Sequence, residues 1–373
     1  MIKEPSPVEV NIDRQCIETF DSQISCAISQ IKWLPNPYVG NKRKLLFTIC
    51  NEIRKEHIKY DTVLDLFSGS ASVSIVMKFL GKKVIANDLL ASSCVYAKAF
   101  VENNGICLSD DEKKFLIKHQ SNNSSDFVQE YYQDRFTRQE AILLDNFSSN
   151  ILELKNSHNG ILKSFMAIAN LQVYIIDHCF VGGRLNHGQI LADVDHRIAH
   201  NRNTQYLSGM KFHDICWYTF FCPDNHNVHS VCNLPAIEAL DKYKNQHIDI
   251  AYVDPPYGGD QSDYVHMYKF FEEFYLGRKL SNTDPQIIHA KDFSNSKLYE
   301  EHFVAMIQAL SYIPVIVLSY NDSSWADIDK VKDIISQFRD TVKVVVSENY
   351  KYKYRDVKNR YGKEYIIFAM GNR

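Results

Sequence analysis

A predicted strand that runs directly into a rigid turn constrains the fold more than any other feature of the chain. Residues 248–253 read IDIAYV, a short β-branched and aliphatic run, and the next four residues are Asp254, Pro255, Pro256 and Tyr257. Two successive prolines restrict the backbone and donate no N–H group, so the strand has to end in a stiff turn. Open α/β sheets bind ligands at the carboxyl ends of their strands, and we expect this turn to lie at such a site.

An earlier part of the chain has the order strand, turn, helix and strand. Residues 62–67 (TVLDLF) and 83–87 (KVIAN) have the composition of short buried strands, and an amphipathic helical pattern covers residues 71–80 between them. Parallel strands connected in this way take a right-handed crossover. The sequence therefore predicts a βαβ unit here.

The alternation of strands and helices fades between residues 104 and 226 and then resumes. Helical patterns within that gap lie near residues 112–119, 138–155 and 161–180. After it come a strand at 228–233, a helix at 235–244, a strand at 314–319, a helix at 324–338, and strands at 342–347 and 364–369 that would form a terminal antiparallel pair. We expect one discontinuous α/β domain with a Rossmann-like, mostly parallel sheet and an inserted, mainly helical unit. The predicted boundaries are 1–30 for an N-terminal extension, 31–105 and 228–373 for the α/β domain, and 106–227 for the insertion.

Composition limits the setting in which such a chain works. Its 373 residues include nine cysteines without a Cys-x-x-Cys spacing, which favours reduced thiols and a cytoplasmic location. No stretch approaches the ~20 apolar residues that a bilayer crossing needs, so we expect no membrane segment. The formal net charge is −3, and a polyanionic partner would therefore have to bind at local basic patches.

The turn after residue 253 carries groups that suit an amine on a planar ring. The lone pair of such an amine is delocalised, and two hydrogen-bond acceptors aimed at the NH2 group draw it out of conjugation. The Asp254 carboxylate and the Pro255 carbonyl can supply these acceptors, and Pro256 stiffens the loop. Tyr257 offers a ring face for stacking, worth roughly 1–3 kcal/mol per base. The alternative is a turn that merely ends a strand.

The strand at 62–67 leads into a second candidate site. Its end and the following turn read Asp65-Leu66-Phe67-Ser68-Gly69-Ser70, which allows close approach of a ligand to the backbone. A Gly-x-Gly-x-x-Gly or phosphate-binding loop is absent, so a pyrophosphate ligand is unsupported. Asp88, after the next strand, can accept hydrogen bonds from ribose hydroxyls, or it is an incidental turn residue.

A basic segment precedes the first predicted strand. Residues 36–44 read NPYVGNKRK and lead into a helical stretch that extends to about Lys55. Its backbone N–H groups and Lys42 could bind a carboxylate, although alone it would more often be a solvated loop.

The order of these motifs resembles that of the Dam-type, alpha-group N6-adenine DNA methyltransferases, over about residues 32–100 and 228–370. The resemblance implies a Rossmann-like methyltransferase that uses S-adenosyl-L-methionine, and it makes residues 106–227 the target-recognition domain. It implies cofactor-binding roles for Tyr38, Gly40, Lys42, Asp65, Phe67, Gly69, Asp88, Asn233 and Asp254. It implies catalytic roles for Asp254, Pro255, Pro256 and Tyr257. Asn233 replaces the Asp that the family often has, and Ala71 stands where many members have a second glycine.

Basic residues mark two candidate contacts with double-stranded DNA. Residues 182–188 (GGRLNHG) are the most site-like stretch of the insertion, where Arg184 can bond guanine or phosphate and His187 lies nearby, although a structural turn fits equally well. A basic, tyrosine-rich tail segment favours phosphate contacts, with an ordinary solvated loop as the alternative. Its candidate contacts are Lys351, Lys353, Arg355, Lys358 and Arg360. His196 and His200 have helical i, i+4 spacing without a third ligand, so we expect no metal.

Other functions remain open at this point. The same fold could methylate RNA adenine or N4 of cytosine in DNA, but an Asp at position 254 favours adenine and the large insertion favours DNA. The chain could also be an inactive DNA-binding module, against which the intact Lys42, Asp88 and Asp254 argue. A DNA methyltransferase of this kind would act alone or beside a cognate restriction endonuclease.

Overall fold

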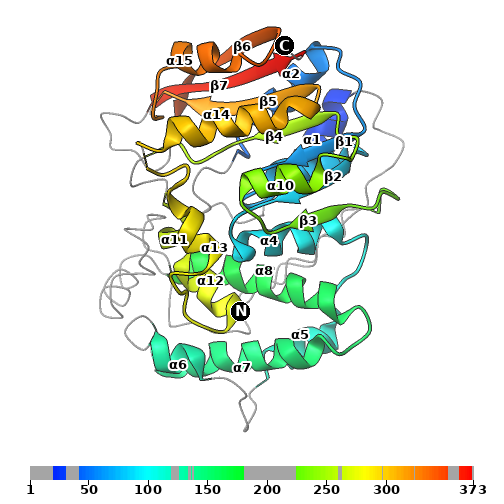
Figure 1. Cartoon of the computed structure of the whole chain (residues 1–373). Coiled ribbons are helices and arrows are strands. Elements are labelled where there is room, and N and C mark those ends of the chain that lie inside the picture. Colours follow the sequence, from blue (N-terminus) through cyan, green and yellow to red (C-terminus); the bar gives the residue numbers. More distant parts are fainter. Residues whose placement is uncertain are drawn as a thin grey trace.

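A seven-stranded sheet in the order β3-β2-β1-β4-β5-β7-β6 organises the computed structural model (Figure 1). Its strands are β1 (Thr62–Asp65), β2 (Lys83–Asn87), β3 (Ser230–Cys232), β4 (Ile250–Val253), β5 (Val315–Asn321), β6 (Thr341–Lys351) and β7 (Tyr361–Met370). The structure describes residues 20–30, 42–118, 126–132, 136, 138–179, 224–258, 263–295, 297–322, 324–351 and 361–371. The first five strands in the order are parallel, and β7 is antiparallel to both β5 and β6. The predicted Rossmann-like sheet and its terminal antiparallel pair are confirmed.

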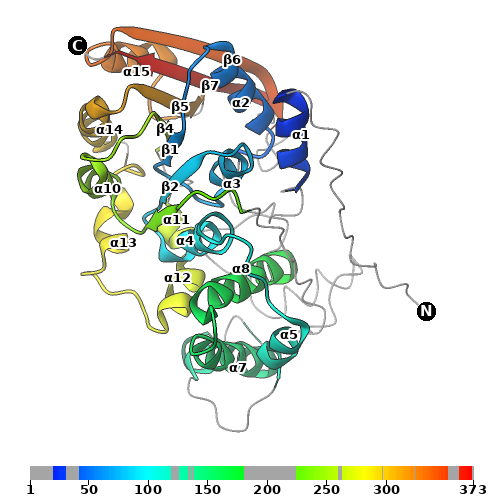
Figure 2. The same cartoon turned by 90° about the vertical axis from the view of Figure 1, so that its right-hand side faces the viewer.

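Helices cover both faces of the sheet, which explains why its strands read as continuous apolar runs. All four residues of β1 and all seven of β5 are buried, as expected for strands with two covered faces. Val63 packs into the cluster on one face, whereas Leu64 packs into the cluster on the other, because successive side chains alternate along a strand. Figure 2 shows the two helical layers on either side of the sheet.

One layer is formed by α1 (Phe20–Gln30), α2 (Leu46–Lys55) and α3 (Ser72–Phe79). The other is formed by α10 (Ala236–Tyr243), α14 (Tyr299–Ala309), η7 (Leu310–Tyr312) and α15 (Ile328–Ile335). Helix α1 was not predicted, yet it belongs to the core, where Ile24 and Ala27 are almost fully buried. Part of the predicted N-terminal extension is therefore packed against the sheet domain.

The middle of the chain is helical, as the sequence predicts. Helix α4 (Ala91–Ala97) continues into the π-helix η1 (Lys98–Glu102), and then come α5 (Asp110–Leu116), α6 (Phe127–Tyr131), α7 (Arg138–Leu154) and α8 (Gly160–Cys179). Helix α8 lies against α4 and η1 (Figure 1): Gln172 Nε2 donates to the Ser92 carbonyl at 3.3 Å, and Lys98 Nζ lies 4.7 Å from the centroid of the Phe165 ring. These helices share one hydrophobic cluster with one face of the sheet.

Short helices after the Asp-Pro-Pro-Tyr turn were not predicted, and they join the sheet to the helical middle of the chain. They are α11 (Tyr264–Met267), α12 (Lys269–Leu276), α13 (Pro285–Ile288) and the 3-10 helix η6 (His289–Lys291). The fully buried Glu272 accepts hydrogen bonds from the backbone N–H groups of Ala91 (3.0 Å) and Ser92 (2.8 Å), at the start of α4. Its neighbour Glu273 pairs with Lys279 Nζ at 2.5 Å and accepts a hydrogen bond from Tyr132.

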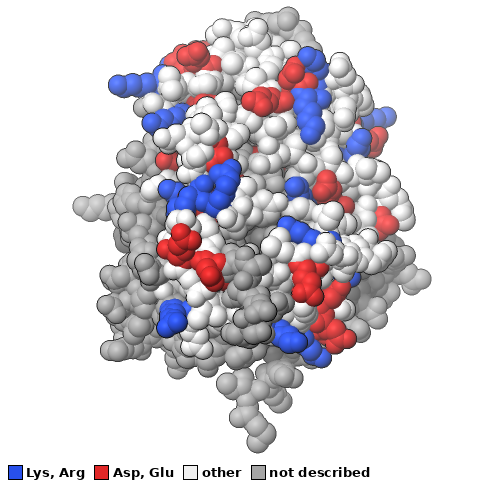
Figure 3. Space-filling view, turned by 60° about the horizontal axis from the view of Figure 1, so that its bottom comes forward, with Lys and Arg blue, Asp and Glu red and all other residues white. Residues whose placement is uncertain are grey.

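One face of the described surface carries charges of both signs in small neighbouring groups. On the face drawn in Figure 3, lysines and arginines lie beside aspartates and glutamates without forming a continuous basic area. Within the described residues, no helix is both long enough and apolar enough to span a bilayer.

A buried lysine closes the end of the π-helix. Lys78, on α3, is 1% exposed, and its ammonium donates to the carbonyls of Phe100 (3.4 Å), Val101 (2.9 Å) and Asn103 (2.5 Å). These carbonyls end a helix and have no further turn to bond with, so the ammonium replaces the missing donors. Lys78 thereby fixes α3 against the segment that follows the second strand.

We expect Lys78→Met to destabilise the protein by about 1–3 kcal/mol, because the substitution removes the donor and leaves buried carbonyls unsatisfied. The free energy of unfolding, measured by urea denaturation, tests this expectation. Lys332→Met, at an exposed position of α15, is the matched control. Equal stability of the two variants would show that Lys78 does not hold this junction.

Candidate active site

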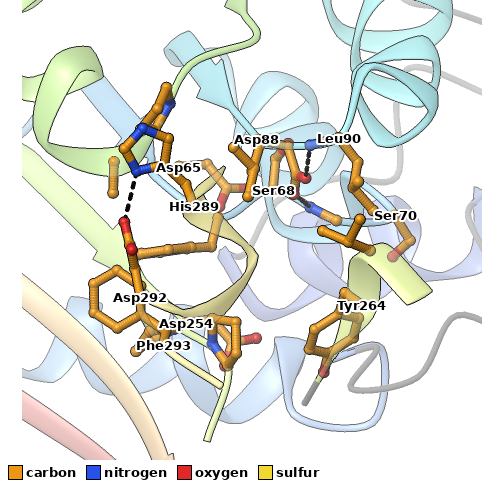
Figure 4. Close-up of a pocket in the computed structure, with 18 of the residues that line it drawn as sticks. Asp65, Ser68, Ser70, Asp88, Leu90, Asp254, Tyr264, His289, Asp292 and Phe293 are labelled. Carbon is orange, nitrogen blue, oxygen red and sulfur yellow. Dashed lines mark hydrogen bonds and ion pairs between the residues drawn. The ribbon is translucent and has the colours of Figure 1, made fainter. Parts of the chain in front are cut away.

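A cavity opens at the carboxyl ends of β1, β2 and β4, with about 970 Å³ of space including its mouth. Residues far apart in the sequence line it: Lys42, the turn from Asp65 to Ser72, Asp88 to Leu90, and Tyr252 with Asp254 to Pro256. Figure 4 shows the labelled side chains around this space. The site lies where a parallel sheet is expected to bind its ligand.

The turn after β1 holds a carboxylate, Asp65, that accepts hydrogen bonds at only one of its two oxygens. Asp65 Oδ2 accepts hydrogen bonds from the Ser74 backbone N–H (3.2 Å) and hydroxyl (2.6 Å). Asp65 Oδ1 and the Ser68 hydroxyl are buried and have no hydrogen-bond partner among the described residues. Burial raises the pKa of the Asp65 carboxyl to about 7. Unsatisfied buried polar atoms are costly, and both residues line the cavity, so a ligand with polar groups would satisfy them.

Two residues of this turn adopt the left-handed backbone conformation. Gly69 has φ 48° and Ala71, the N-cap of α3, has φ 57°. The left-handed conformation favours glycine, so Ala71 adopts it at a steric cost that a glycine at the same position would avoid.

Asp88 links the turn after β2 to the turn after β1. Its Oδ2 accepts a hydrogen bond from the Gly69 N–H at 2.8 Å, and its Oδ1 accepts one from the Leu90 N–H at 2.9 Å. Burial raises the pKa of the Asp88 carboxyl to about 6. The backbone thus fixes the orientation of this carboxylate on the cavity wall.

At the end of β4, three side chains form a closed polar group. Lys42 Nζ lies 2.8 Å from Asp254 Oδ2 and 2.7 Å from the Tyr257 hydroxyl, which donates to Asp254 Oδ1 at 2.5 Å. Lys42 is 5% exposed. Burial and the nearby Asp254 raise the pKa of Tyr257 well above its usual value, so its hydroxyl stays protonated and can donate. The loop leaves the site at Gly258, where φ is 83° and an added Cβ would lie 3.1 Å from Trp325 Cβ.

The structure brings together nine of the twelve residues that the sequence predicts for catalysis and cofactor binding. Eight of them line the cavity: Lys42, Asp65, Phe67, Gly69, Asp88, Asp254, Pro255 and Pro256. Tyr257 lies directly behind them in contact with Lys42 and Asp254. Asn233 is not part of the lining, and its amide donates to the carbonyls of Asp88 (2.9 Å) and Leu89 (2.8 Å).

The remaining predicted residues lie outside the part of the chain whose side chains the structure describes. Lys351 is the last residue of β6, and only its backbone is described. The others are Tyr38, Gly40, Arg184, His187, Lys353, Arg355, Lys358 and Arg360.

Sequence reasoning missed one wall of the cavity. Tyr264 and Val265 of α11, together with His289, Asp292 and Phe293, also line it. No motif marks these positions; the only sequence signal is an aromatic-rich stretch after the Asp-Pro-Pro-Tyr turn.

The sheet and its cavity are consistent with a Rossmann-like methyltransferase fold. Comparison with known proteins agrees: residues 38–174 match the family model for D12 class N6 adenine-specific DNA methyltransferases. The chain is also 26% identical over 343 residues, 90% of this chain and 97% of the relative, to the Type II methyltransferase M2.HphI of Haemophilus parahaemolyticus. These similarities support an N6-adenine DNA methyltransferase, and such an enzyme needs a methyl donor.

The buried carboxyl of Asp65 predicts a stability that depends on pH. Its pKa is raised to about 7 in the folded state, so the folded protein binds more protons than the unfolded chain between about pH 4 and pH 7. Stability associated with Asp65 is therefore fully present below pH 4 and is lost as the pH rises through 7.

We accordingly expect Asp65→Asn, which cannot ionise, to exceed the wild type in melting temperature by a larger margin at pH 8 than at pH 5. Thermal denaturation at both pH values, without ligand, is the measurement. Asp61→Asn is the control, because the Asp61 side chain is fully exposed. A difference from wild type that stays constant between pH 5 and pH 8 would argue against a raised pKa.

Proposed function

We propose that the protein transfers the methyl group of S-adenosyl-L-methionine to N6 of an adenine flipped out of double-stranded DNA, within a specific recognition sequence. The observation that carries this proposal is the opening of the Asp254 turn into the same cavity as Asp65, Ser68 and Asp88. The acceptor for an amine and the groups for a nucleoside ligand thereby share one space.

The polar atoms of the cavity fit this methyl donor. The unsatisfied Asp65 Oδ1 suits the ammonium of its methionine end, and the Ser68 hydroxyl can donate to its carboxylate. Asp88 can accept from the ribose hydroxyls beside it, and Phe67 supplies apolar surface. The ligand has no phosphate, in agreement with the absence of a phosphate-binding loop.

The Asp254 turn would activate the amine. With a flipped adenine in place, the Asp254 carboxylate and the Pro255 carbonyl would accept the two N6 hydrogens, which localises the lone pair on nitrogen. N6 then bonds the methyl carbon while the carbon–sulfur bond breaks, and the sulfur keeps that electron pair as a thioether. The extra proton on N6 passes to Asp254 and on to water, so no covalent enzyme intermediate is needed.

Lys42 would hold Asp254 ready for this step. Its ammonium lies 2.8 Å from Asp254 Oδ2 and keeps that oxygen oriented, while Tyr257 occupies Oδ1 at 2.5 Å. An arriving adenine amine would displace the Tyr257 hydroxyl as the donor to Oδ1. The freed Tyr257 ring could then stack on the base.

We further propose that residues 106–227 read the DNA sequence, with Arg184 and His187 among the contacts, and that the tail segment from Lys351 to Arg360 contacts phosphates. The relative M2.HphI is a Type II methyltransferase, and we infer a corresponding modification role beside a cognate restriction endonuclease for this cytoplasmic enzyme. No metal is required for methyl transfer to a neutral amine.

Asp254→Asn should lower methyl transfer at least about 100-fold, because a neutral amide accepts hydrogen bonds more weakly at the point where charge develops. The assay follows labelled S-adenosylmethionine into unmethylated duplex DNA, while calorimetry checks that cofactor binding persists. Asp241→Asn, whose side chain is 72% exposed, serves as the control. Full activity of Asp254→Asn would refute the assigned role.

A single methylated sequence motif is expected in DNA from cells that express the protein. Sequencing that detects modified bases, together with mass analysis of the nucleosides, would identify N6-methyladenine within that motif. Methylcytosine as the product, or methylation confined to RNA, would exclude the proposed substrate.

A further inference from the structure

The wall that sequence reasoning missed carries a polar pair with no assigned role. His289 Nδ1 lies 2.8 Å from Asp292 Oδ2, and the two side chains are 31% and 22% exposed. Both residues line the cavity. Figure 4 shows them on one side of this space, across from Ser70, Leu90 and Tyr264.

The strand order fixes which part of a bound nucleoside this wall would meet. Asp254 follows β4, the Asp65 turn follows β1 and Asp88 follows β2, and the sheet continues in the same direction to β3. A ligand with its methyl group at Asp254 and its ribose at Asp88 would therefore extend its base toward the end of β3. This placement of the base follows from the proposed use of S-adenosylmethionine, on which the inference depends.

His289 lies at that end of the cavity. Its Nε2 is 4.0 Å from Glu238 Oε1, in the first turn of α10, the helix that follows β3. Pro235 and Ala236, at the start of the same helix, line the cavity as well. The pair therefore stands beside the apolar surface on which the base would lie.

The wall is held in place from two sides. Phe293 is 8% exposed and packs edge-to-face on Phe67, with ring centroids 5.3 Å apart. On the other side, Gln286 of α13 donates to Glu272 Oε1 at 2.9 Å, and Glu272 binds the start of α4 just after Asp88. The ribose-binding turn and the His289 wall are thus connected through buried hydrogen bonds.

The His289–Asp292 contact sets the hydrogen-bonding character of the other ring nitrogen, Nε2, which lies beyond hydrogen-bond distance of Glu238 Oε1 at 4.0 Å. A carboxylate only accepts, so Nδ1 carries the proton that it donates to Asp292, and in the neutral ring Nε2 is left as an acceptor. An exocyclic amine is the donor on adenine. Asn233, where the related enzymes often have an acid, instead donates its amide to the carbonyls of Asp88 and Leu89.

We propose that His289, oriented by Asp292, accepts a hydrogen bond from the exocyclic amine of the methyl donor's adenine and so determines the base specificity of the cofactor site. His289 is the binding residue and Asp292 the positioning residue.

The test compares two ligands by calorimetry: S-adenosylhomocysteine, which carries the amine, and S-inosylhomocysteine, which carries an oxygen acceptor in its place. The wild type should prefer S-adenosylhomocysteine by about tenfold or more, since an acceptor facing an acceptor loses the hydrogen bond. The preference should largely disappear in His289→Ala and be partly restored in His289→Gln, whose amide oxygen can accept.

Asp292→Asn distinguishes a positioning role from a purely structural one, because only a positioning role predicts a change in the preference between the two ligands. An Asn amide can donate to Nδ1, which shifts the ring proton to Nε2 and makes that nitrogen a donor. The preference should therefore narrow or reverse toward S-inosylhomocysteine. His247→Ala, at an 83% exposed side chain at the opposite end of β4, is the matched control and should keep the wild-type preference.

The outcomes separate this inference from the proposed function. If the wild type binds neither S-adenosylhomocysteine nor S-adenosylmethionine, the proposed cofactor is wrong. If the wild type and His289→Ala show the same ratio of affinities for S-adenosylhomocysteine and S-inosylhomocysteine, the assignment of His289 is overturned while the proposed function stands. A wild-type preference retained in Asp292→Asn would remove the positioning role of Asp292.

Discussion

The crowding of carboxylates in one buried cavity is the constraint on which the rest of the structure depends. Asp65, Asp88 and Asp254 all line the same space, and burial raises the pKa values of the first two to about 7 and about 6. Backbone N–H groups offset part of this cost at Asp88, and Lys42 does so at Asp254. A cationic methyl donor would offset more, so the site is better suited to its ligand than to remaining empty.

Two further buried carboxylates connect the surrounding helices. Glu272 and Glu273 are fully buried on α12, and they receive their hydrogen bonds from α4, Tyr132 and the chain near Lys279. These contacts connect the segment after the Asp254 turn to the turn that holds Asp88 and to the helices of the middle segment. If DNA and cofactor bind to different parts of the chain, as proposed, such rigid connections would bring both to one point.

The sequence predicted the sheet because its signals are local and strong. Runs such as TVLDLF and IDIAYV end in turns whose residues are chemically distinctive, so both the strands and the polar residues after them could be located. The wall formed by His289, Asp292 and Phe293 could not be, because its role arises from packing against Phe67 and α10 rather than from any spacing along the chain. The contact of Lys42 with Tyr257, 215 positions away, likewise depends on the tertiary fold.

The position of β7 has a consequence for synthesis of the enzyme. This strand hydrogen-bonds to β5 on one side and β6 on the other, although it follows both in the chain. A nascent polypeptide that has not yet emerged beyond residue 360 leaves the long, buried strand β5 with an open edge near the Asp254 turn. Contacts between distant segments form late in folding. A fragment that ends before residue 360 would therefore contain the Asp254 turn and still lack the strand that pairs with β5 next to it.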